Sequence, residues 1–66
     1  MELIIIKSGD DYIRVKNDSY FCVPLDKASV FPMDALDQAR LHLTNLNAEG
    51  FEKVVLKRLI LTEEDL

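Results

Sequence analysis

The N-terminal part of the chain alternates between apolar runs and short polar breaks. Residues 2–7 form a β-branched, apolar run that is typical of a buried strand. Residues 12–16 alternate with a period of two, which directs Ile13 and Val15 inward. The polar break between these runs contains Gly9, a residue that readily adopts the positive φ of a tight turn. The pattern predicts a β-hairpin.

A third, short strand is expected after a second polar break. Residues 20–23 are largely apolar, and Pro24 ends the strand or places it at an edge, because proline has no N–H to donate to a neighbouring strand. Residues 25–31 form a connection rather than a strand in this interpretation. Three of its hydrophobic residues are expected to pack under the following helix: Ala28, Val30 and Phe31.

The central segment predicts one helix over residues 32–49. Pro32 suits the first turn, where its missing N–H is no loss. Apolar residues recur at spacings of three and four and form one stripe: Leu36, Ala39, Leu43 and Leu46. The opposite side is polar: Asp37, Arg40, Thr44 and Asn47. Gly50 fits the left-handed position after the helix, and the motif to which it belongs would place Phe51 on Leu46.

Residues 54–61 predict a final strand that is mostly apolar on both faces. We expect this strand to pair beside the first, because these two are the most apolar. The order strand, strand, short strand, helix, strand favours a single α+β domain over residues 1–66. In this architecture an antiparallel sheet of three to four strands carries one helix packed on one of its faces.

One helix can cover only one face of such a sheet, so the other face needs a different cover. The residues expected on this second face, and hence in a candidate interface, are Leu3, Ile5, Val55, Leu59 and Leu61. Exposed together they would form an apolar patch of a size that monomers rarely show. Either residues 25–31 and the C-terminal tail fold over the patch, or the chain self-associates. We favour self-association, as a homodimer with identical patches joined about a two-fold axis.

The length and composition of the chain also favour self-association. A chain of 66 residues buries only about 60% of its unfolded surface, so domains of this size often need a disulfide, a metal or a partner subunit. The single cysteine and single histidine allow neither an intrachain disulfide nor a four-ligand zinc site. Residues 3–6 are too short an apolar run for a signal peptide or a membrane span, so a cytoplasmic location is expected.

The side chains that carry chemistry in other proteins are isolated here. Cys22 is expected to be a half-buried strand residue, and His42 to flank the apolar stripe of the helix. The acidic clusters at residues 10–11 and 63–65 supply too few oxygens for a calcium loop. We therefore expect no catalytic residue, no metal, no cofactor and no small-molecule substrate.

The charge of the chain argues against nucleic acid as a partner. Twelve acidic residues against eight basic ones give a formal net charge of −4, which disfavours phosphate binding. A weak single-strand RNA surface would need Tyr12 and Tyr20 beside a basic patch. The candidates for that patch are Arg14, Lys16, Lys57 and Arg58.

Residues 25–31, LDKASVF, lead into a helix that contains Ala39, and Gly50-Phe51 then precede a strand. This arrangement resembles a loose group of small bacterial and prophage-encoded proteins with a hairpin, a K-A-x-x-F connection, a helix, a G-F/Y cap and a final strand. The resemblance implies an accessory protein without an assigned activity, so no functional residue is carried over.

The combined expectation is a non-enzymatic protein that binds another protein or itself. The alternative is an acidic inhibitor or nucleic-acid mimic of the kind that phages use. That alternative requires carboxylates clustered on one surface, and the candidates lie around the helix: Asp34, Asp37, Glu49 and Glu52.

Overall fold

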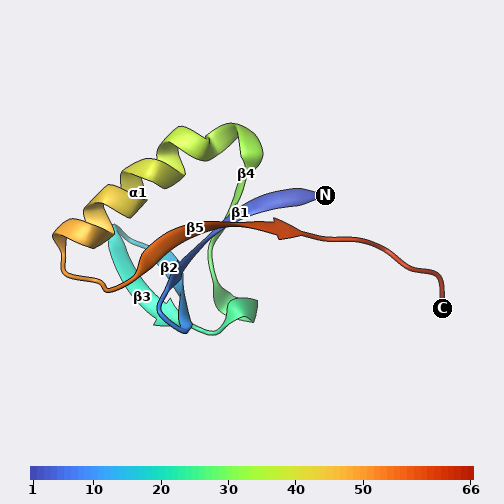
Figure 1. Cartoon of the computed structure of the whole chain (residues 1–66), viewed down its shortest axis with the longest axis horizontal. Coiled ribbons are helices and arrows are strands. Elements are labelled where there is room, and N and C mark those ends of the chain that lie inside the picture. Colours follow the sequence, from blue (N-terminus) through green and yellow to red (C-terminus); the bar gives the residue numbers. More distant parts are fainter.

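The computed structural model describes all 66 residues and shows an antiparallel five-stranded sheet with one α-helix across one face (Figure 1). The α+β class, the antiparallel sheet and the single packed helix are therefore confirmed. The elements in chain order are β1 Glu2–Ser8, β2 Asp11–Lys16, β3 Ser19–Val23, a 3₁₀ turn at Leu25–Lys27, β4 Val30–Pro32, a second 3₁₀ turn at Met33–Ala35, α1 Leu36–Ala48 and β5 Val54–Ile60. Neither α1 nor the 3₁₀ turns have the length and apolar content needed to cross a membrane.

β1 is the centre of the sheet. One edge of β1 pairs with β5 along its whole length, from Glu2 opposite Ile60 to Ser8 opposite Val54. The other edge is shared, because β2 pairs with its C-terminal end and β4 with its N-terminal half. β3 then pairs with β2 on the outside. The expected pairing of the final strand with the first is confirmed, and β5 is an edge strand.

Residues with positive φ make the two hairpin turns between the first three strands. Gly9 has φ +59° in the turn between β1 and β2. Asn17 and Asp18 have φ 51° and 61° between β2 and β3. Positive φ at both central residues is the signature of a type I′ turn, whose twist matches that of the strands it joins. The two predicted turns are both present.

The sheet has one more strand than the three to four expected, because Val30–Pro32 form the short strand β4 opposite Leu3–Ile5 of β1. The prediction that the helix starts at Pro32 was correspondingly wrong. Pro32 has an extended backbone, with φ −66° and ψ 158°, and ends an edge strand where its missing N–H costs nothing. A 3₁₀ turn follows, and the α-helix begins only at Leu36.

The C-terminal end of α1 agrees with the prediction. Gly50 has φ +93°, and the N–H of Phe51 donates to the carbonyl oxygen of Leu46 at 3.1 Å. This hydrogen bond closes the predicted motif, in which the residue after the glycine returns to the last turn of the helix. The Phe51 side chain packs against the core cluster that contains Leu46.

The core lies between α1 and the helix-facing side of the sheet. Ile6, Ile13 and Leu46 are fully buried in contact with one another, and Ala39 is also fully buried. Leu36 and Leu43 complete the stripe and are half-buried. The helical periodicity therefore identified the correct face of α1.

Candidate interaction surface

The face of the sheet away from α1, called the second face here, is built from alternate residues of the central strands. Leu3, Ile5 and Lys7 of β1 stand opposite Leu59, Lys57 and Val55 of β5. Cross-strand partners point to the same side of a sheet, so these six side chains share one face. Leu61 continues the alternation one position past β5. The five residues of the predicted interface therefore lie on one face: Leu3, Ile5, Val55, Leu59 and Leu61.

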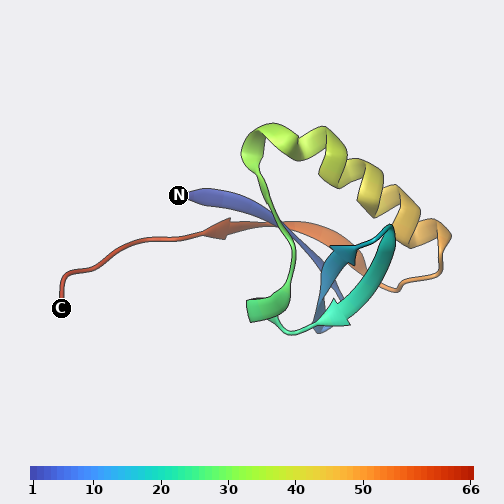
Figure 2. The same cartoon turned by 180° about the vertical axis from the view of Figure 1, so that it is seen from behind.

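Ile5 is the exception to the expected exposure, because only 2% of its surface is accessible. Tyr12, Leu25 and Leu59 line a hollow of about 220 Å³ around it, and the Lys7 ammonium lies 5.5 Å from the centre of the Tyr12 ring. The connection after β3 therefore covers the middle of the second face. Such a cover by residues 25–31 was the alternative to self-association. The C-terminal tail does not take part in this cover, since it runs away from the sheet (Figures 1 and 2).

The rest of the second face is open. Val55 is 42% exposed and Leu61 46% exposed, while Leu3 and Leu59 are half-buried. Val30 adds to this surface at 47% exposure. The expectation that Val30 packs under the helix was wrong, because it stands opposite Ile5 and so shares the second face. An apolar band therefore follows β5 and the adjoining part of β1.

Phe31 and Ala28 behave differently from Val30. Phe31 stands opposite Ile4, which places it on the helix side of the sheet, and it packs against the core cluster. Ala28 is half-buried in the connection. The prediction that this connection contributes to the core is therefore correct for Phe31.

The outer edge of β5 has no neighbouring strand, because β5 pairs only with β1. Met1 and Leu61 exchange two hydrogen bonds, from the Met1 amino group to the Leu61 oxygen at 3.0 Å and from the Leu61 N–H to the Met1 oxygen at 2.8 Å. Antiparallel pairs alternate between bonded and non-bonded positions, so the odd-numbered residues of β5 bond to β1. The even-numbered residues direct their N–H and C=O groups outward: Val54, Leu56, Arg58 and Ile60.

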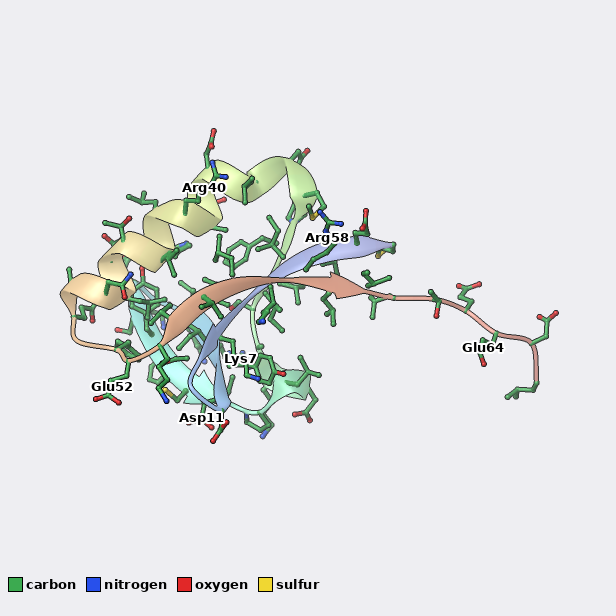
Figure 3. All side chains as sticks on the ribbon, viewed as in Figure 1. Lys7, Asp11, Arg40, Glu52, Arg58 and Glu64 are labelled. Atoms are coloured by element: carbon green, nitrogen blue, oxygen red, sulfur yellow. The ribbon has the colours of Figure 1, made fainter.

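β5 is followed by an exposed acidic segment. Residues 61–66, called the C-terminal segment here, continue the line of β5 away from the body of the protein (Figure 1). Glu64 lies far out along this segment in Figure 3. None of its carboxylates forms an ion pair within the chain. The tail that could have covered the second face is thus an extended segment, bonded to the body of the protein only at Leu61.

The two cations in the middle of β5 point to opposite sides. Arg58 lies on the helix side (Figure 3) and its guanidinium is 3.4 Å from a carboxylate oxygen of Glu2, with both side chains largely exposed. Such an exposed pair contributes little stability. Lys57 lies on the second face without an ion-pair partner. β5 therefore presents an unpaired positive charge among apolar side chains.

His42 has a structural partner that the sequence did not reveal. Its Nδ1 is 2.8 Å from the Tyr20 hydroxyl, which also accepts a hydrogen bond from the Asn45 side-chain amide at 3.3 Å. The Phe31 ring lies against the imidazole, with ring centres 5.5 Å apart. The cluster ties β3 to α1. His42 flanks the apolar stripe, as expected.

The other candidate side chains stay dispersed. Cys22 is exposed, which corrects the expectation of a half-buried residue: it stands opposite Ile13 on the edge strand β3. Tyr12 lies on the second face whereas Tyr20 bonds to His42 on the helix side. Lys57 and Arg58 likewise point to opposite sides of the sheet. The two tyrosines therefore do not share a face, although Arg14, Lys16 and Lys57 lie on the same side of the sheet as Tyr12.

The carboxylates around the helix are also separated. Asp34 lies in the 3₁₀ turn before α1 and Asp37 in its first turn, whereas Glu49 and Glu52 lie past its end. The 13 residues of α1 span about 20 Å. Arg40 lies between the two groups and points away from the sheet (Figure 3). This spacing does not favour the acidic-mimic alternative.

Comparison of the chain with protein-family models, with curated proteins and with solved structures found no match. The resemblance to small prophage-encoded proteins stays a prediction. The structural features that suggest a function are the exposed apolar side chains of the second face and the open outer edge of β5.

Proposed function

We propose that this protein acts by binding protein, without catalysing a reaction, and that it self-associates through the second face of its sheet. The observation that carries this proposal is the apolar band along β5. Val55, Leu59 and Leu61 lie along this face with Lys57 between the first two, and two of the three are more than 40% exposed. Removing such side chains from water is the main driving force of protein association.

The hollow around Ile5 adds support. Leu25 and Tyr12 cover the middle of the face but leave its β5 side uncovered. A second copy would present the same band, and a two-fold axis would place the two bands together. Burial of the two apolar bands would also add to the small stability that a core of six buried residues provides.

Leu61 offers a clean test, because its exposed side chain leaves the core untouched. Leu61→Lys is expected to remain a folded monomer at concentrations where the unaltered chain is a dimer, as measured by light scattering on a sizing column. The matched control is Leu41→Lys, which alters a leucine 60% exposed on α1. The control should still dimerise. Equal masses for the two variants would contradict the proposal.

A further inference from the structure

We infer that two copies of this chain join edge to edge, with β5 and the C-terminal segment of one copy paired antiparallel to those of the other. This inference rests on the proposed self-association and deepens it, because edge pairing would place the two second faces side by side in one continuous sheet and join their apolar bands at Leu59 and Leu61. It starts from two unpartnered features of the same strand. β5 has an open outer edge, and the segment that continues it is extended, with Leu61 held by Met1 and no further backbone hydrogen bond to the body beyond it.

Access to this edge is unobstructed. In Figure 1 β5 passes in front of β1 and β4 with no element before it, and in the reverse view of Figure 2 it passes behind them. The helix packs on the face of the sheet rather than over this edge. A second strand can therefore lie beside β5 and receive hydrogen bonds from its outward N–H groups.

Charge complementarity selects the occupant of the edge. Lys57 and Arg58 lie at the middle of β5, so pairing the centres of two β5 strands would set like charges against each other. The C-terminal segment carries the opposite charge in Glu63, Glu64 and Asp65. Sliding the two strands until each acidic segment meets the cations of the other copy removes the repulsion and makes the contact reciprocal.

One register satisfies the backbone, pairs Lys57 with an acidic residue and brings the leucines of the second face together. It places Ile60 on the two-fold axis, opposite Ile60 of the second copy, and its pairs on either side are Leu59 with Leu61, Arg58 with Thr62, Lys57 with Glu63 and Leu56 with Glu64. The even-numbered residues then exchange backbone hydrogen bonds, as their outward direction requires. Lys57 and Glu63 fall at a non-hydrogen-bonded pair, where side chains approach most closely.

The same register buries the most exposed apolar side chains of the strand. Ile60 is 61% exposed and Leu61 46% exposed in the single chain. In the pair, Leu59 and Leu61 from both copies form a four-leucine cluster on the second face, flanked on each side by a Lys57–Glu63 ion pair. Sliding the strands by two residues instead would pair Lys57 with Asp65 and Arg58 with Glu64, but it would set Leu59 against Glu63 and so break up the four-leucine cluster.

Charge reversal tests the register directly, with dimer affinity measured by sedimentation equilibrium. Lys57→Glu and Glu63→Lys should each raise the dissociation constant by about tenfold or more, since each creates two repulsive contacts across the two-fold axis. Mixing the two variants should give a heterodimer with both ion pairs restored. Glu49→Lys makes the same charge change at the far end of α1 and should leave the affinity unchanged.

A backbone variant supplies a second test that leaves the single chain intact. Thr62→Pro removes an outward N–H beyond β5, so the fold of one copy does not depend on it. It should weaken the dimer by about tenfold, because it removes two symmetry-related hydrogen bonds. Unchanged affinity in Thr62→Pro would overturn the edge pairing.

The outcomes separate this inference from the proposed function. A monomer at every concentration would reject self-association and the pairing with it. A dimer that is lost in Leu61→Lys but indifferent to Lys57→Glu, Glu63→Lys and Thr62→Pro would keep the second-face proposal and reject the edge pairing. Rescue of Lys57→Glu by Asp65→Lys in place of Glu63→Lys would overturn the register.

Discussion

The burial of Leu46 allows the most quantitative prediction about the fold. This side chain is fully buried against Ile6 and Ile13, with Phe51 packed on the same cluster. Leu46→Ala removes the side chain from that cluster and leaves a cavity, a change that costs about 3 kcal/mol in the free energy of unfolding. A chain of 66 residues has a total stability of about 3 to 10 kcal/mol, so this loss is a large part of it.

Leu41 provides the matched control, because it lies on the same helix and is 60% exposed. Leu41→Ala should change the stability by less than about 0.5 kcal/mol, since it buries nothing and alanine favours helix. Urea unfolding followed by circular dichroism measures both variants. With a slope of about 1 kcal/mol per molar urea for a chain of this size, the Leu46 variant should unfold at a midpoint about 3 M lower.

The measurement needs two safeguards. Dimer formation adds stability that depends on concentration, so each curve is recorded at two protein concentrations. If Leu46→Ala is unfolded without urea, Ile6→Val tests the same cluster at a cost of about 1 kcal/mol. Similar midpoints for the Leu46 and Leu41 variants would refute the assignment of the core between α1 and the sheet.

Two further predictions concern the ends of the core. Gly50→Ala should lower the unfolding free energy by about 1 kcal/mol, because a φ of +93° strains any residue with a Cβ. No atom lies close enough to clash with the added Cβ, so the backbone strain is the whole effect. A urea midpoint equal to that of the unaltered chain would argue against the helix end described here. Tyr20→Phe should cost about 1 kcal/mol in thermal or urea unfolding, since it removes the hydroxyl that bonds to His42 and Asn45, and an unchanged stability would mean that this cluster is not formed in solution.

Local signals in the sequence predicted the elements that local interactions determine. The spacing of Leu36, Ala39, Leu43 and Leu46 identified the buried side of α1, and Gly50 identified its end. The turn residues located both hairpins in the same way. These patterns depend on contacts within a few positions of the chain, which a single sequence displays directly.

The features that the sequence did not predict depend on contacts between distant segments. β4 is only three residues long, and Pro32 is equally compatible with the start of a helix and the end of an edge strand. The burial of Ile5 depends on Leu25, twenty positions away. The open edge of β5 follows from the order of strands in the sheet, and periodicity carries no information about that order. The residues named for the candidate interface do share one face, while their role as an interface stays a prediction, and the open edge of β5 was not foreseen.

The central claim, that this chain associates with itself along β5, is tested most directly by its molar mass in solution. Light scattering across a wide concentration range should show the mass rising from the 7.6 kDa of one chain toward twice that value. The rise should be absent in Leu61→Lys. A mass that stays at that of a single chain at the highest concentration would contradict the account.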